Sequence, residues 1–103
     1  MVDTKDIIER IHLDFGSRSP EAIKILNEGI LKADYLNSNR IIRCILFLAN
    51  GDFEKLKKHV GNAIYDPRDV MLRAEYINIE HSNPKRIRDF NKTFEKSEDN
   101  VQQ

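Results

Sequence analysis

Cysteine and histidine are the side chains with which a short chain most readily builds a metal site or a nucleophile, and this sequence has one cysteine and three histidines. Cys44 lies in the most apolar stretch of the chain, so we expect it to be a buried hydrophobic residue. A nucleophilic thiol needs instead a lowered pKa and access to a substrate. The histidines, His12, His59 and His81, are far apart and form no cluster with zinc-ligand spacing. The sequence therefore predicts no metal, no cofactor and no catalytic residue.

Lys57 and Lys58 precede His59 in a segment with helical periodicity, which makes this histidine the most plausible reactive side chain. The arrangement resembles histidine phosphotransfer domains in part, because these carry a phosphoryl group on an exposed histidine of a small helical bundle. Such domains usually have a lysine and a small residue three and four positions later, where this chain has Asn62 and Ala63. A solvated surface histidine is the simpler interpretation. Phosphotransfer through His59 is therefore the third hypothesis for function.

A basic stretch from Lys85 to Lys92 is the best candidate interaction surface, with Phe90 and Phe94 on a second face if the segment is helical. Such a helix could bind an acidic protein or a nucleic-acid backbone, together with the basic residues Lys55, Lys57 and Lys58. A structural interpretation is equally simple: the two aromatic rings pack into the core and the charges face water. Nucleic-acid binding through this C-terminal helix is the alternative hypothesis for function.

Several large residues fall outside the apolar stripes of the predicted helices: Tyr35, Leu36, Phe47, Tyr65 and Tyr76. Large side chains left outside a core often mark an interface. The leading hypothesis is therefore a non-enzymatic protein–protein interaction module whose partner is another protein or a second copy, as in a homodimer. The candidate interaction surface comprises Tyr65, Tyr76, Lys85, Arg86, Arg88 and Lys92.

Composition narrows the classes of protein further. The chain has 103 residues, enough for one domain, with 17 basic and 17 acidic side chains and a formal charge of zero. No global positive field draws it to nucleic acid or to an acidic membrane. The first ten residues lack the basic start and apolar run of a signal peptide, and no stretch is long and apolar enough to span a bilayer. With a single cysteine as well, we expect a cytoplasmic protein without membrane contact.

The elements that position these residues are predicted to be helices. A capping residue precedes each of the three prolines, at Ser19-Pro20, Asp66-Pro67 and Asn83-Pro84, and proline is favoured at the first helical position. Asp52, after Asn50-Gly51, marks a fourth start. Apolar residues recur at helical spacing, which predicts helices at about 4–15, 20–35, 39–49, 53–64, 67–77 and 84–96.

The segment 39–49 is apolar around nearly its whole circumference, so we expect it to be the central, buried helix, with a buried strand as the alternative. Gly29 lies inside a predicted helix, which a close helix crossing would explain. The sequence thus predicts an all-α fold of about six short antiparallel helices, as a compact bundle or a short α-solenoid-like array. Residues 1–96 form the single domain and 97–103 a frayed polar tail.

Overall fold

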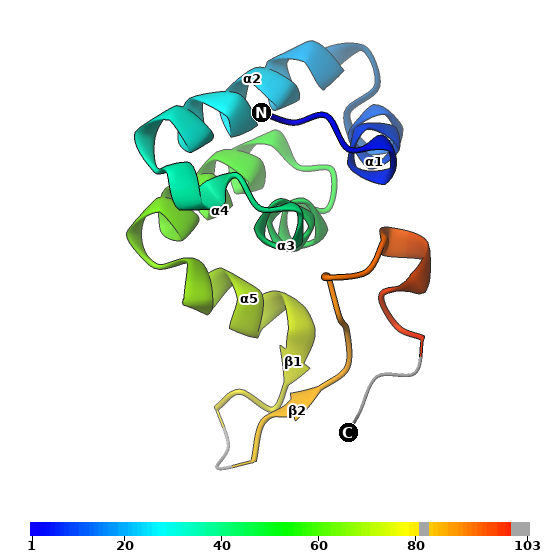
Figure 1. Ribbon diagram of the computed structural model, residues 1–103, viewed down its shortest axis with the longest axis vertical. Helices are drawn as coiled ribbons and strands as arrows, with labels where there is room; N and C mark the ends of the chain where they lie inside the picture. The colour runs from blue at the N-terminus through cyan, green and yellow to red at the C-terminus, as the bar shows by residue number, and fades with distance from the viewer. Residues whose placement is uncertain (81–82, 100–103) are drawn as a thin grey trace.

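Helices make up most of the chain in the computed structural model, which describes residues 1–80 and 83–99 (Figure 1). In these residues there are five α-helices: α1 (Lys5–Phe15), α2 (Ser19–Lys32), α3 (Asn39–Ala49), α4 (Phe53–Tyr65) and α5 (Pro67–Glu75). Three short 3-10 helices accompany them: η1 (Gly16–Arg18), η2 (Asp34–Leu36) and η3 (Phe94–Lys96). A two-residue antiparallel pair, β1 (Tyr76–Ile77) and β2 (Lys85–Arg86), follows α5.

Capping side chains determine where several helices begin. Ser38, Asp52 and Asp66 each accept a backbone N–H from the first turn of the helix that follows, as the sequence predicts for the two aspartates. Ser19 differs from the prediction because it already lies inside α2. Its buried hydroxyl donates to the carbonyl of Gly16, at 2.6 Å, so it ties α2 to the preceding turn rather than capping the helix.

The third helix lies at the centre of the core, as predicted. All six residues from Ile41 to Leu46 are buried, and α3 packs against α1, α4 and α5. In Figure 1, α1 and α3 are seen end-on while α2, α4 and α5 lie across the view, so the helices do not share one axis. Where α2 meets α4, a Cβ on Gly29 would lie 2.8 Å from Cγ1 of Val60, which confirms the predicted close crossing.

The prediction of a sixth helix at 84–96 is wrong. Its first residues form β2, residues 87–93 are in neither helix nor strand, and only η3 is helical. The backbone N–H groups of Ile87 and Arg88 both donate to the carbonyl of Glu75, at 2.8 and 3.1 Å. These amides are therefore bound to another element rather than to the fourth residue before them, because tertiary contacts outweigh the local helical periodicity.

The folded region also extends past the domain boundary expected at residue 96. Ser97 is buried, and its carbonyl accepts the backbone N–H of Asp89 at 2.7 Å. Residues 97–99 are thus part of the ordered C-terminal region, whereas residues 100–103 of the predicted tail lie outside the described residues, as does His81. No helix in the described part of the chain is both long and apolar enough to cross a bilayer.

Candidate functional site

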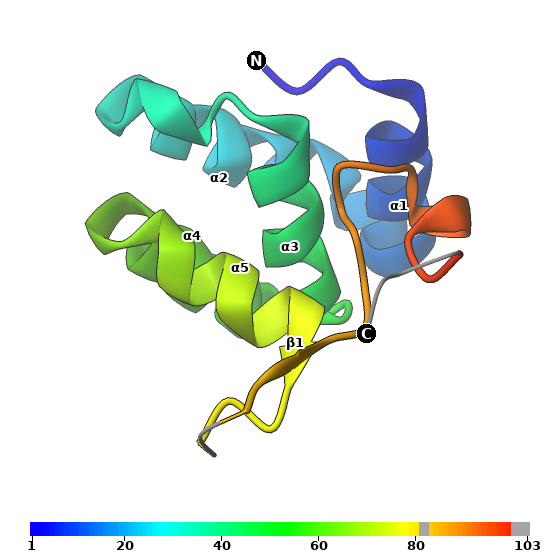
Figure 2. The same ribbon diagram turned by 60° about the horizontal axis from the view of Figure 1, so that its bottom comes forward.

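The residues that the sequence indicates for function lie in two separate places. One is the hairpin end, where α4 stops at Tyr65 and α5 starts at Pro67 with only Asp66 between them; it is at the left in Figure 1. The other is the C-terminal segment, residues 87–97, whose later part, with η3, lies next to α1 in both views (Figures 1 and 2).

An open hollow of about 570 Å³ lies along the α4–α5 hairpin. Side chains of both charge signs are present around it. It is lined by Lys58, His59, Asn62, Tyr65, Asp66, Asp69 and Arg73. The Asp69 carboxylate accepts from Nε of Arg73 at 3.0 Å, the ion pair expected from two residues four apart on a helix.

His59 is half-buried beside this hollow. Its Nδ1 is inaccessible and has no hydrogen-bond partner among the described residues. Burial, together with the positive charges of Lys58 and Arg73, lowers the pKa of His59 below its ordinary value, which favours the neutral imidazole. The prediction that His59 is solvated is therefore only partly correct, because its Nδ1 is inaccessible to solvent.

Two tyrosines lie near the hairpin end. The side chain of Tyr65 is 93% exposed, the most exposed large hydrophobic residue in the described chain. The hydroxyl of Tyr35, from η2, donates to the carbonyl of Ile64, which brings a second aromatic residue to the end of α4. Tyr76 lies in β1 at the opposite end of α5, so the structure does not bring it together with Tyr65.

Most cations of the predicted basic stretch, Lys85 to Lys92, are hydrogen-bonded to other groups of the chain. Arg86 donates to Asp89 at 2.8 Å. The Arg88 guanidinium donates to a carboxylate oxygen of Glu98 at 3.3 Å and to the carbonyl of Ala74 at 3.3 Å, and it lies over the ring of Phe47. Nζ of Lys92 donates to the carbonyl of Asp99 at 2.9 Å. Lys85 is exposed.

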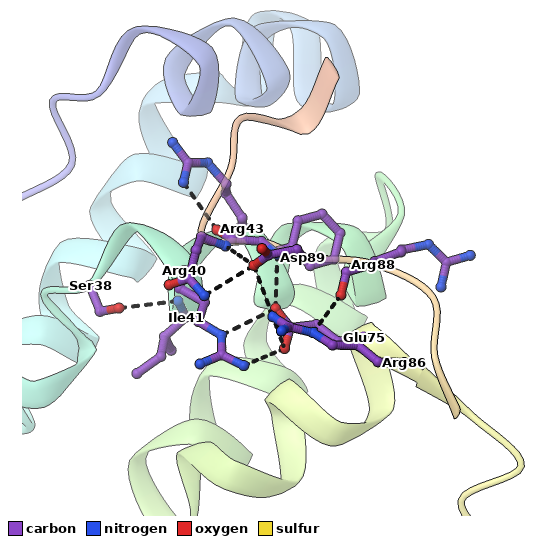
Figure 3. A network of polar contacts seen from close by, with 10 residues as sticks. Ser38, Arg40, Ile41, Arg43, Glu75, Arg86, Arg88 and Asp89 are labelled. Carbon is purple, nitrogen blue, oxygen red and sulfur yellow. Dashed lines mark hydrogen bonds and ion pairs between the residues drawn. The ribbon is translucent and has the colours of Figure 1, made fainter. Parts of the chain in front are cut away.

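A buried network that the sequence did not predict centres on Glu75, whose side chain is 0% exposed (Figure 3). Its carboxylate accepts from Nε and Nη2 of Arg40, at 3.1 and 2.5 Å, so the pair is bidentate. The same carboxylate accepts the backbone N–H of Phe90 at 2.9 Å, and Arg86 lies 3.5 Å away. One buried acid thus joins α3, α5, β2 and the C-terminal segment.

A similar arrangement joins Asp6 of α1 to Arg43, which lies about one turn after Arg40 on α3. Asp6 accepts from Nε and Nη2 of Arg43, at 3.0 and 2.9 Å, and from the backbone N–H of Phe94 at 3.0 Å. Burial by itself would raise the pKa of Asp6, but the hydrogen bonds from Arg43 and Phe94 and the Arg43 charge outweigh it and lower the pKa. Nη1 of Arg43 also donates to the carbonyl of Phe90 at 3.1 Å.

Comparisons with known proteins do not extend this description. No family model, no curated protein and no solved structure matches the chain.

A signal for the buried network was present in the sequence. Arg40 and Arg43 are three residues apart on the helix that is otherwise almost wholly apolar. A cation on such a helix must find a carboxylate, because burying an unpaired charge is costly. The sequence does not show which acid it finds, since Asp6 is 37 positions away from Arg43 and Glu75 is 35 from Arg40.

Cys44 directly follows Arg43 on α3 and is fully buried, as predicted. Burial raises the pKa of its thiol, with a further contribution from the negative charge of Glu75. The thiol is therefore protonated and inaccessible in the native protein. Within the described residues, no group of three or more histidine, cysteine, aspartate or glutamate side chains is placed to hold a metal ion.

Proposed function

We propose that this protein is a non-enzymatic interaction module of the cytoplasm, which binds another protein or a second copy through its hairpin end. The observation that supports this most is the position of Tyr65. A tyrosine that is 93% exposed at the end of a rigid helix offers a large aromatic surface at little entropic cost. Tyrosine is enriched among the residues that dominate the binding energy of interfaces.

The surroundings of Tyr65 suit a protein partner. The hollow beside it carries Lys58 and Arg73 as cations and Asp66 and Asp69 as anions. A rim with both signs of charge can match the mixed polar surface of a protein, whereas for a polyanion the two aspartates offset the attraction of Lys58 and Arg73. The proposal therefore favours a protein over a nucleic acid at this place.

Site-specific photo-crosslinking tests the proposal directly. A photoreactive phenylalanine analogue replaces Tyr65 in one variant and Leu13 of α1 in the control, because Leu13 is also a large residue that is 82% exposed. We expect light-dependent crosslinked species in cells from position 65 and few from position 13. Equal crosslinking at both positions, or none at position 65, would contradict the assignment of the hairpin end.

The molar mass by light scattering distinguishes a second copy from a different protein. If the partner is a second copy, the mass rises with concentration and Tyr65→Asp reduces that rise, since a charge at the centre of an interface is costly. If the partner is a different protein, the wild-type chain remains a monomer and the crosslinked species from position 65 contains another chain.

A further inference from the structure

Gly61 lies inside α4, where the described part of the chain gives no reason for a glycine. It is exposed, its φ is not positive, and a Cβ there would meet no heavy atom within 4 Å. Glycine inside a helix costs about 1 kcal/mol relative to alanine. At Gly29 close packing offsets that cost, because the missing Cβ leaves room for Val60 of α4. Gly61 leaves the same room on the outer side of α4, where the backbone of another helix can approach closely.

Gly61 forms a notch in a ridge that has a hollow on either side. The ridge is α4, which lies between α2 and α5 (Figure 1). On the α2 side, Gly61 lines a groove of about 280 Å³ whose apolar wall includes Val60 and Ile64. On the α5 side is the hollow of the α4–α5 hairpin, with Lys58 and Asn62 on its α4 wall. A helix that crosses α4 at Gly61 therefore meets the smallest residue of the ridge and has space on both sides.

The side chain that fits such a hollow is on the same helix. Tyr65 follows Gly61 by four residues, about one helical turn, and is 93% exposed. Lys58, on the wall of the hollow, precedes Gly61 by three residues. When two copies of α4 cross antiparallel at Gly61, residues after the crossing point of one helix face residues before it in the other. Tyr65 of each copy then lies beside Lys58 of the other, so this surface is complementary to itself, as a two-fold interface requires.

The charges favour the antiparallel direction. Lys58 is exposed and has no ion pair in the described part of the chain, since the nearby acid Glu54 pairs with Lys57 at 3.6 Å. The C-terminal end of α4 carries the partial negative charge of its free carbonyls, and Asp66 follows it. An antiparallel crossing brings Lys58 of one copy towards that negative end of the other, and its ammonium towards the Tyr65 ring. A parallel crossing would bring the two lysines together.

We propose that a second copy of this chain docks on α4, with the two α4 helices crossing antiparallel at Gly61 and Tyr65 of each copy in the α4–α5 hollow of the other. This dimer is the second-copy form of the proposed function and rests on it. The contact uses one face of a 13-residue helix, about 20 Å long, so it belongs to the smallest class of specific interfaces. The chain is therefore a monomer when dilute and a dimer at high concentration.

Gly61→Gln tests the crossing point, because the new side chain starts in open space and fills the notch. Glutamine is a good helix former, so the dilute variant should be at least as stable as the wild-type chain. In sedimentation equilibrium, the concentration at which half of the chains are dimeric should rise at least about tenfold. His12→Gln, at an exposed position of α1, is the matched control and should leave that concentration unchanged. A wild-type chain that stays monomeric up to about 1 mM, or equal dimerisation in both variants, would overturn the proposal.

A cysteine introduced beside Gly61 locates the two-fold axis, since only residues close to that axis meet their own copies. In Asn62→Cys, a short bismaleimide should link two chains covalently. His12→Cys should give no linked dimer at the same concentration. Cys44 is 0% exposed and does not compete for the reagent. Linkage that is absent at position 62, or equal at both positions, would contradict the proposal.

The photo-crosslinks from position 65 separate a failure of this geometry from a failure of the proposed function. Crosslinks to a different chain, with no effect of Gly61→Gln, would leave the hairpin end as an interface and rule out the dimer. The absence of any crosslink from position 65 would contradict both. Crosslinks between two copies that are lost in Gly61→Gln would support both.

Discussion

The carboxylate of Glu75 accepts the backbone N–H of Phe90 while the Glu75 carbonyl accepts the N–H groups of Ile87 and Arg88. One residue at the end of α5 thus holds three backbone N–H groups of the C-terminal segment. Figure 3 shows how Arg40 completes the arrangement from α3. Because the acid is fully buried, its charge is compensated almost entirely by these partners, and the docking of the C-terminal segment depends on them.

Replacing Glu75 by glutamine should therefore be strongly destabilising. The variant keeps the shape of the side chain but leaves the Arg40 charge without its acid, and we expect a loss of about 2–4 kcal/mol in the free energy of unfolding. Urea denaturation followed by circular dichroism measures it. Glu98→Gln, at an acid that is 69% exposed and paired with Arg88, is the control and should change stability by less than about 0.5 kcal/mol. Equal losses in both variants would contradict the central role of Glu75.

Asp6 makes stability depend on pH in the acid range. Its pKa is lower in the folded protein than its ordinary value of 3.8, so the unfolded chain takes up a proton at higher pH than the folded one. The contribution of Asp6 to stability is therefore complete above the unfolded pKa and is lost as the pH falls through the folded pKa. We expect the free energy of unfolding of the wild-type chain to decrease below about pH 4.

The Asp6→Asn variant should show a flatter decrease over the same range, because asparagine does not titrate. Asp3→Asn, which changes an exposed carboxyl nearby, is the matched control and should retain the slope of the wild-type chain. Asp89 contributes in the same direction: burial alone would raise its pKa, but hydrogen bonds from Asn91 and the charge of Arg86 lower it overall. An unchanged slope in Asp6→Asn would show that the Asp6–Arg43 pair does not couple to folding.

The helical part of the fold could be predicted because its determinants are local. Asp52 and Asp66 cap the helices that they precede, and Gly51, at a φ of 78°, follows the end of α3. The apolar residues on nearly every face of the segment 39–49 identified α3 as the central helix. Signals of this kind lie within a few residues of the element that they determine.

The C-terminal region could not be predicted for the opposite reason. Asn83-Pro84 and the four-residue spacing of Phe90 and Phe94 are typical of a helix, yet the acids that hold this segment are Glu75 and Asp6, the latter 88 positions from Phe94. Contacts over such separations leave no periodic pattern. Two arginines of the candidate surface are also paired within the chain, Arg86 with Asp89 and Arg88 with Glu98.

Cys44 should be almost inert towards thiol reagents while the protein is folded. The side chain is 0% exposed and burial raises the pKa of the thiol, so reaction requires an opening of the structure. We expect the native chain to react at least about a thousandfold more slowly than the chain in denaturant, in line with the small population of open states. The measurement is the absorbance change with a chromogenic disulfide at neutral pH. A native rate within about tenfold of the denatured rate would show that α3 is accessible.

Gly29 and Gly61 should respond to alanine in opposite directions, although both lie inside helices. A Cβ on Gly29 would lie 2.8 Å from Cγ1 of Val60, whose β-branched side chain has few rotamers with which to move away. Gly29→Ala should therefore lower the free energy of unfolding by about 1–3 kcal/mol, despite the better helix propensity of alanine. The measurement is thermal and urea unfolding.

Gly61→Ala is the matched control, since a Cβ there meets no heavy atom within 4 Å and its backbone is helical. Alanine reduces the entropy of the unfolded chain and adds no clash, so this variant should be more stable than the wild-type chain by about 0.5–1 kcal/mol. If both substitutions stabilise the protein, α2 and α4 are further apart than the structure shows. If both destabilise it, the space beside Gly61 is occupied, and the face of α4 that it marks belongs to a contact with another molecule.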